Sequence, residues 1–148
     1  MSIQLEKTFK EWMHLSLRNS LGNFMRFAKE KNYSIAQLNT LIHLSQNQEC
    51  NLSGLGEVFG VTNAAVSQVM EKLVQQGLVL RTENPEDRRH KILILTERGE
   101  KIAHESEQER LKWLFQLINI LSEEEKQLIE SAMRLLINKA TMVNEQKS

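Results

Sequence analysis

The chain has 148 residues, which suits one domain, and its composition of 41% hydrophobic and 26% charged residues is ordinary for a globular protein. No apolar run approaches the roughly 18 residues that a membrane span needs, so no membrane contact is expected. The N-terminus lacks the basic-then-apolar order of a signal peptide, and a single cysteine, Cys50, cannot form an intrachain disulfide. A cytoplasmic protein is therefore expected. Nineteen basic residues balance nineteen acidic ones, which argues against indiscriminate binding to polyanions.

Apolar residues at helical spacing open the chain. They predict a long helix over residues 4–30, because positions three and four apart share one face of a helix. Asn32 and Ser34 interrupt the pattern, and Ser34 is suited to cap a second helix that carries apolar residues from Ile35 to Leu44. The apolar face of the first helix consists of Leu5, Phe9, Trp12, Met13, Leu17, Leu21, Phe24 and Ala28.

Two short helices are predicted next, over residues 53–59 and 63–76. Gly77 supplies the stop signal for the second of them. The runs LVLRTE and KILILT then flank the polar loop NPEDRRH, a pattern typical of a β-hairpin.

The chain ends in two further predicted helices. Thr96 is expected to cap the first, and Ser122 with Glu125 forms a Ser-x-x-Glu capping box for the second. The predicted order is α-α-α-α-β-β-α-α, a mainly α fold with one small β-hairpin.

Residues 52–71 have the spacing of a helix-turn-helix. Gly56 lets the second helix cross the first closely, and Gly60 permits the positive φ of a tight turn. The residues expected to hold the second helix against the first are Val61, Val66 and Val69.

The exposed side of this second helix is predicted to read bases. From Val58 to Met70 there is no charged residue, although 26% of the chain is charged. Asn and Gln can bond an adenine edge in two places, Ser and Thr are versatile, and helix N-terminal amides favour phosphate. The alternative is a surface helix that happens to be neutral. Thr62 is a good N-cap for the helix, and its exposed side carries Asn63, Ala64, Ser67, Gln68, Glu71 and Lys72.

The hairpin is only slightly basic. Segment 81–91 carries four formal cations and three acids, a net charge of +1. An arginine at its protruding tip can enter a narrow minor groove, and Asp87 can orient such an arginine through a carboxylate–guanidinium bond. The alternative is that these charged residues only keep an exposed edge hairpin soluble and do not contact DNA. The cations are Arg81, Arg88, Arg89 and Lys91, and His90 is expected to face phosphate.

Together these residues resemble the MarR family of winged-helix regulators. The resemblance covers nearly the whole chain and is strongest over 52–99. Its most specific element is Asp87-Arg-Arg89-x-x-x-Leu93-x-Leu95-Thr96 followed by Gly99, preceded by Gly77-Leu-Val79-x-Arg81 and Pro85.

The resemblance implies an obligate dimer whose first and last helices interlock and whose two winged-helix lobes contact adjacent major grooves. By position, 63–75 corresponds to the recognition helix, Arg89 to a wing-tip arginine held by Asp87, and Arg81 to a phosphate contact. The DNA-contacting residues implied are Ser53, Thr62, Asn63, Ala64, Ser67, Gln68, Lys72, Arg81, Asp87, Arg88, Arg89 and Lys91.

One MarR-like domain is therefore expected over 1–148, with a DNA-binding lobe at 34–99 and dimerisation helices at 1–33 and 100–148. The outer helices carry more apolar surface than one small lobe can cover, which supports a homodimer independently. A two-fold axis would separate two half-sites on double-stranded DNA by about 10–10.5 base pairs.

Family members typically release DNA when a small molecule, an oxidant or a metal acts on them. The resemblance implies a hydrophobic crevice where the first, second and fifth helices meet the lobe, lined here by Trp12, Met13, Ser16 and His43. Trp12 is equally compatible with a place in the core.

The other effector classes and other functions have less support. Cys50 follows Glu49, which raises the pKa of a thiol and makes an inert cysteine the expected case. No glycine-rich phosphate loop, HExxH or GxSxG is present, so no enzyme and no cofactor are expected.

The prediction is a DNA-binding regulator that is released from DNA by a small-molecule effector. Regulators of this family are most often repressors. The alternatives are a redox- or metal-responsive regulator of the same fold, or a protein-interaction module without DNA binding. The histidines give little support to a metal site, because no two of them are spaced four residues apart on one helix. They are His14, His43, His90 and His104.

Overall fold

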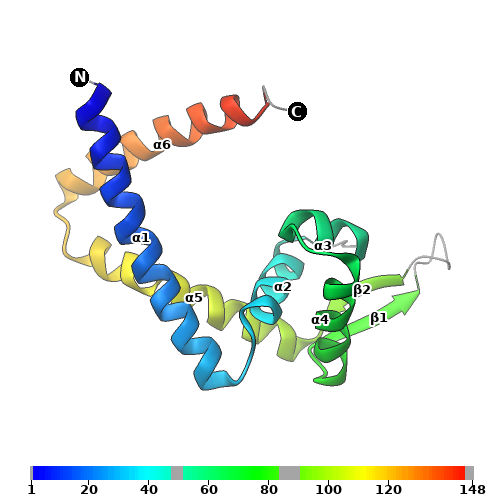
Figure 1. Cartoon of the computed structure of the whole chain (residues 1–148). Coiled ribbons are helices and arrows are strands. Elements are labelled where there is room, and N and C mark those ends of the chain that lie inside the picture. The colour runs from blue at the N-terminus through cyan, green and yellow to red at the C-terminus, as the bar shows by residue number, and fades with distance from the viewer. Residues whose placement is uncertain (1, 48–51, 84–90, 146–148) are drawn as a thin grey trace. The chain divides into compact units, whose positions relative to one another are not determined.

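The computed structural model describes residues 2–47, 52–83 and 91–145. Six helices and one antiparallel hairpin follow in the predicted order, so the expected fold class is confirmed (Figure 1). Within these residues no helix is long and apolar enough to cross a membrane. The elements are α1 (Ser2–Lys31), α2 (Ile35–Gln46), α3 (Leu52–Phe59), α4 (Asn63–Gln75), β1 (Val79–Glu83), β2 (Lys91–Leu95), α5 (Glu97–Asn119) and α6 (Glu123–Glu145).

The chain divides within α5 into two compact units, Met1–Lys112 and Trp113–Ser148. The first unit contains α1 to α4, the hairpin and most of α5. The second contains the end of α5 and all of α6. Each unit is described by itself.

Side-chain caps begin the helices where the sequence predicts them. The Ser34 hydroxyl accepts from the Gln37 N–H at 3.1 Å, and Gln37 Oε1 accepts from the Ser34 N–H at 2.9 Å. Ser122 and Glu125 form the same reciprocal pair at α6, at 3.2 and 2.8 Å. At this end of α6, hydrogen bonds from its own backbone N–H and from Ser122 lower the pKa of Glu124. Both capping boxes satisfy N–H groups that a helix leaves unpaired at its start.

Three helices end through a residue with positive φ: α1 at Asn32 (57°), α3 at Gly60 (62°) and α4 at Gly77 (67°). After each of these residues, the next N–H donates to the carbonyl oxygen five residues back. This is the bond of a Schellman motif. The bonds run from Tyr33 to Ala28, Val61 to Gly56 and Leu78 to Leu73, at 2.9, 3.0 and 2.9 Å.

The hydrophobic core lies in the first unit. It combines the last third of α1 with one face each of α2, α3, α4, the hairpin and the beginning of α5. Its largest fully buried apolar residues are Phe24, Leu38, Leu41, Leu55, Met70, Leu73, Leu78 and Val79. The winged-helix lobe therefore has a continuous core of its own within one chain.

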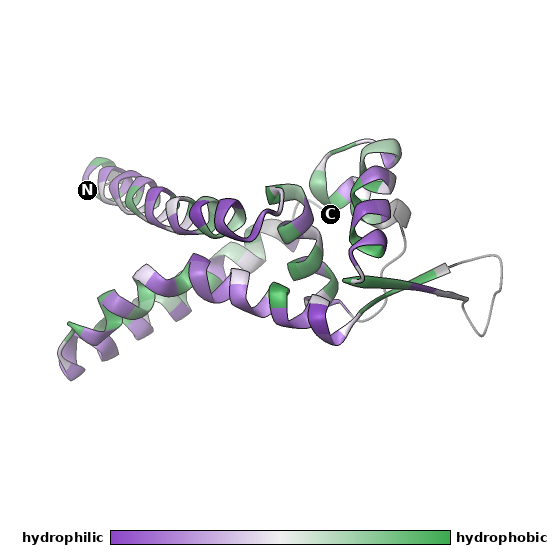
Figure 2. Ribbon diagram, turned by 90° about the horizontal axis from the view of Figure 1, so that it is seen from below, coloured by the Kyte–Doolittle hydropathy of each residue, from purple (hydrophilic) through white to green (hydrophobic). Residues whose placement is uncertain are grey.

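The long helices instead expose apolar residues. Only Phe24 and Ala28 of the predicted face on α1 are buried, and Met13, Leu17 and Leu21 are 58%, 52% and 46% exposed. Apolar and polar residues alternate along α1 in Figure 2. In the second unit, an apolar stripe runs along α6 at heptad spacing. It consists of Leu128, Ile129, Leu135, Leu136, Met142 and Val143, which are 71%, 40%, 59%, 37%, 55% and 53% exposed.

Candidate nucleic-acid interface

Helix α4 lies at the surface of the lobe with one buried and one exposed side. Val66, Met70 and Leu73 are at most 4% exposed and belong to the core. The opposite side consists of the uncharged residues that the sequence analysis singles out, followed by one acidic residue and one cation. All of them are exposed: Asn63, Ala64, Ser67, Gln68, Glu71 and Lys72. The predicted division of the helix into a core side and a solvent side is confirmed.

The turn between α3 and α4 is tight at Gly56. A Cβ atom there would lie 2.7 Å from Asn63 Oδ1, so the Asn63 side chain would have to move, and 3.1 Å from the Val61 carbonyl oxygen, which is a tight contact. The close crossing predicted for Gly56 and the positive φ predicted for Gly60 are thus both confirmed. Of the three residues expected to hold the second helix against the first, Val66 is buried, whereas Val61 lies on the turn and is 47% exposed.

Thr62 sets the beginning of α4. Its backbone is extended (φ −69°, ψ 151°), and its Oγ1 accepts from the Ala65 N–H at 3.2 Å. This bond satisfies one of the N–H groups that the first turn of a helix leaves unpaired, while the positive end of the helix dipole stays at the surface. The predicted N-cap is confirmed.

The C-terminal end of α4 is fixed by several hydrogen bonds. Gln37 Nε2 donates to Gln76 Oε1 at 2.9 Å, which joins α2 to the residue that caps α4. Arg98 Nη1 donates to the Gln76 carbonyl oxygen at 3.2 Å, and Thr96 Oγ1 donates to the Gly77 carbonyl oxygen at 2.8 Å. Helix α4 is thereby anchored to both α2 and α5 at this end.

Gly99 allows α5 to approach the beginning of the hairpin. A Cβ atom at this position would lie only 2.0 Å from the Leu78 carbonyl oxygen. Thr96 caps α5 as predicted, because its Oγ1 accepts from the Gly99 N–H at 3.0 Å. The family motif contains Thr96, but nothing in the sequence indicated that its side chain bonds to the residue after the end of α4.

The hairpin has one buried and one exposed face. Val79 and Leu93 are buried, whereas Leu80 and Ile94, which are paired across the strands, are 53% and 45% exposed. Arg81, the middle residue of β1, pairs with Leu93 in the register and is exposed.

Part of the residues predicted to contact DNA lies outside the described residues, namely Asp87, Arg88, Arg89 and His90 at the hairpin tip. Cys50, which is expected to be inert, also lies outside them. Ser53 and Lys91 lie in α3 and β2, but the structure does not describe their side chains. The DNA contacts of these residues stay predictions.

The predicted effector residues lie on two helices. Trp12 and Ser16 are half-buried on α1, and Met13 is 58% exposed. Ser16 Oγ is buried and has no hydrogen-bond partner among the described residues. His43 lies on α2 with its ring edge-on to Phe59, at 5.6 Å between centroids. A shared crevice for these residues stays a prediction.

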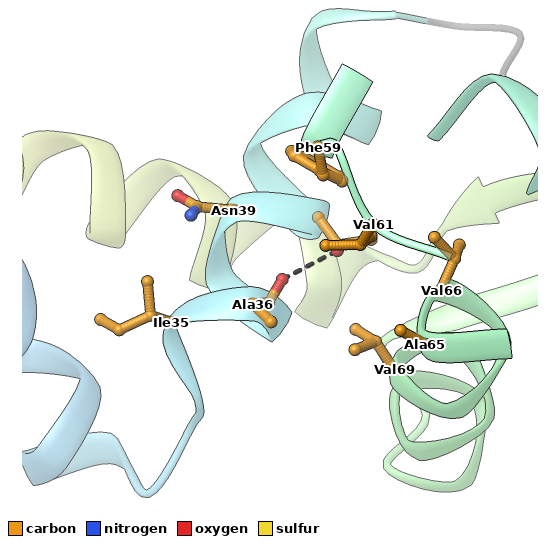
Figure 3. A pocket seen from close by; sticks show the side chains of 9 residues that line it. Ile35, Ala36, Asn39, Phe59, Val61, Ala65, Val66 and Val69 are labelled. Carbon is orange, nitrogen blue, oxygen red and sulfur yellow. Dashed lines mark hydrogen bonds between the residues drawn. The ribbon is translucent and has the colours of Figure 1, made fainter. Parts of the chain in front are cut away.

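A separate pocket lies between α2, the α3–α4 turn and α4 (Figure 3). Its volume is about 300 Å³, within the range of small-molecule sites. It is lined by Ile35, Ala36, Asn39, Thr40, Phe59, Val61, Ala65, Val66 and Val69. In the part of the chain that the structure describes, no three His, Cys, Asp or Glu residues are grouped so as to hold a metal ion.

The fold and the surface of α4 define a winged helix-turn-helix protein. Residues 33–91 match the model of the MarR family. A helix-turn-helix transcriptional regulator of Bacillus subtilis, YfiV, is 26% identical over 125 residues, which cover 84% of this chain and 78% of that protein. A second B. subtilis regulator of this type, YdgJ, is 28% identical over 106 residues, 71% of this chain and 65% of that protein.

Solved structures show the same fold. A MarR family protein from Bacillus stearothermophilus superimposes with a TM-score of 0.79 at 18% identity, covering 95% of this chain and 99% of the other. A variant of MepR from Staphylococcus aureus, bound to an oligodeoxyribonucleotide, superimposes with a TM-score of 0.62 at 18% identity, covering 92% and 97%. The resemblance to the MarR family is confirmed: its model matches residues 33–91, and the similar curated proteins are helix-turn-helix transcriptional regulators.

Proposed function

We propose that this chain is a repressor that binds a pseudo-palindromic operator as a homodimer and releases it when a small-molecule effector binds. The observation that carries the proposal is the exposed, uncharged side of α4, whose opposite side is locked into the core. A helix with one fixed side and one free side of Asn, Ser and Gln residues is suited to enter a major groove.

The proposed roles follow from the order of the residues along α4. Thr62 and the first turn lie at the positive end of the helix dipole and suit a phosphate contact. Ser67 and Gln68, one turn further on, are exposed and can reach base edges. Lys72 follows after one more turn, where its long side chain suits the phosphate backbone.

The hairpin adds a second contact in the proposed complex. Arg81 binds phosphate from β1, and Arg89 enters the minor groove with Asp87 orienting its guanidinium group. The DNA-bound MepR variant, which shares this fold, supports the use of such a lobe on DNA. Because the chain has no net charge, binding to non-specific DNA is expected to be weak.

The apolar stripe on α6 supports the dimer. Leu128, Leu135 and Met142 recur every seven residues and are more than half exposed in a single chain. Such spacing is typical of a helix whose apolar side packs against another helix. Large exposed apolar surfaces on monomers are rare, so a second copy of the chain is the proposed occupant.

The test is a mobility shift on the DNA upstream of the protein's own gene, across a salt series. The logarithm of the binding constant is expected to fall linearly with the logarithm of the salt concentration. Arg89→Ala is expected to weaken binding severely, and Gln68→Ala to relax base preference at one position by about 1–3 kcal/mol. Arg134→Ala, which removes an exposed arginine of α6, is the control. If Arg89→Ala and Gln68→Ala both bind like the parent, the proposed roles are wrong.

A further inference from the structure

Glu71 lies in the middle of the exposed side of α4. It follows Ala64 by two turns and shares one line along the helix with it, because about 3.6 residues complete a turn. This line lies opposite the buried side, where Met70 and Leu73 have no exposed surface. A ligand that contacts α4 from the solvent side therefore meets the Glu71 carboxylate.

The carboxylate has no cation to neutralise it within α4. In the part of the chain that the structure describes, Glu71 forms no hydrogen bond and no ion pair. It lines a surface hollow of about 250 Å³ together with Gln68, Lys72 and Gln75. Residues three and four positions away are the ones that pair on a helix surface, and here all four are uncharged. They are Ser67, Gln68, Val74 and Gln75.

Glutamates on the other helices do have such partners. Ion pairs at a spacing of three or four residues occur on α1, α5 and α6, and they join Glu6 to Lys10, Glu109 to Lys112 and Glu130 to Arg134. An unpaired carboxylate in the middle of a surface that meets DNA is repelled by phosphate. Its place on α4 is favourable only if a hydrogen-bond donor on a base compensates for this repulsion.

The edges of the four bases differ in whether they offer such a donor. An ionised carboxylate only accepts hydrogen bonds, so it is repelled by guanine O6 and N7 and by thymine O4, which are acceptors too. Adenine offers its N6 amino group, but the N7 acceptor lies beside it. Cytosine offers its N4 amino group with no second acceptor in the major groove. Cytosine is therefore the base that suits Glu71 best.

We propose that Glu71 is a specificity-determining residue that accepts a hydrogen bond from the N4 amino group of a cytosine in each half-site. This inference rests on the proposed function, because α4 must lie in a major groove. Gln68 precedes Glu71 by about 4.5 Å along the helix axis, close to the ~3.4 Å between successive bases. The two side chains thus contact neighbouring base pairs, Gln68 an adenine and Glu71 a cytosine.

The experiment starts from sites that the full chain selects from random double-stranded DNA. The parent is expected to select cytosine at one position of each half-site. Glu71→Gln is expected to select adenine there, since glutamine can bond an adenine edge in two places. Replacing that C·G pair by T·A is expected to weaken binding of the parent by about tenfold or more, and that of Glu71→Gln by less than about threefold.

Two further variants separate the position of the carboxylate from its charge. Glu130→Gln removes one negative charge from the surface of α6 and is expected to keep the base preference of the parent. Glu71→Asp keeps the charge but shortens the side chain by one methylene group. It is expected to lose most of the cytosine preference while binding non-specific DNA as weakly as the parent.

The outcomes distinguish this inference from the proposed function. If the parent selects a site and Glu71→Gln prefers the same base at every position, the inference is wrong while the proposed function stands. The inference is also wrong if Glu71→Gln binds every sequence more tightly by one common factor, because the carboxylate then acts only on phosphate. If the parent selects no sequence at all, the proposed function fails and the inference falls with it.

Discussion

The winged-helix lobe and the outer helices use apolar residues in opposite ways. In the lobe, the apolar residues of α2, α4 and the hairpin are gathered into a core in which Leu38, Met70 and Val79 have no exposed surface. On α6, residues of the same kind at equally regular spacing, such as Leu128 and Leu135, are more than half exposed. The difference shows that one chain completes the core of the lobe, whereas the apolar stripe of α6 stays exposed in a single chain, where a second copy is the proposed occupant.

The largest expected effect is on the lobe. Gly99→Ala places a Cβ 2.0 Å from the Leu78 carbonyl oxygen, so the backbone must shift. The free energy of unfolding is expected to fall by about 3 kcal/mol or more. Gly22→Ala is the matched control, because its Cβ meets nothing within 4 Å, and it should stabilise α1 by about 0.5–1 kcal/mol. Denaturant titration of both variants checks this, and equal stabilities would contradict the packing described at Gly99.

The next effect separates the outer helices from the lobe. Leu135→Glu puts a charge into the apolar stripe of α6 and is expected to weaken dimerisation about a hundredfold, or roughly 2.7 kcal/mol. The lobe should keep its fold, because Leu135 is 59% exposed in one chain. Sedimentation equilibrium measures the dimer, and Gln127→Glu on the same helix is the control. A variant that stays as dimeric as the parent would remove α6 from the proposed interface.

A smaller effect concerns the link between α2 and α4. Gln37→Met removes the donor to Gln76 and the acceptor for the Ser34 N–H while keeping a side chain of similar volume. Loss of these part-buried bonds is expected to cost about 1–3 kcal/mol of stability. Operator affinity should fall further than in Ser34→Ala, which removes only the hydroxyl acceptor for the Gln37 N–H. Equal operator affinities in the two variants would show that the bond to Gln76 does not position α4.

The smallest expected effect is at the beginning of α4. Thr62→Ala removes the acceptor for the Ala65 N–H and is expected to cost about 1 kcal/mol. Thr62→Ser keeps the hydroxyl and should retain most of this stability. Thermal unfolding of the two variants distinguishes a capping role from a simple loss of side-chain volume, which would affect both variants alike.

Local patterns were enough to predict most of the fold. Capping residues such as Ser34, Thr62 and Ser122 and the turn glycines Gly60 and Gly77 act over a few positions, so the chain itself displays them. The two sides of α4 were predicted for the same reason, since helical spacing alone separates them.

Long-range contacts could not be predicted in the same way. Gln37 and Gln76 are 39 residues apart, and nothing in either local pattern indicates their hydrogen bond. The pocket also went unpredicted, because its walls come from α2 and α4 and appear only when these helices pack. The exposure of Val61 had the same origin: its place on the turn, and not its hydrophobicity, decides whether it is buried.

Two copies of the chain are proposed to read one symmetric DNA site. This proposal can be tested by hydroxyl-radical footprinting on sequences selected from random double-stranded DNA. We expect one enriched pseudo-palindrome with two protected half-sites whose centres lie about 10–10.5 base pairs apart. Failure to enrich any sequence, or protection of a single asymmetric segment, would contradict the proposal.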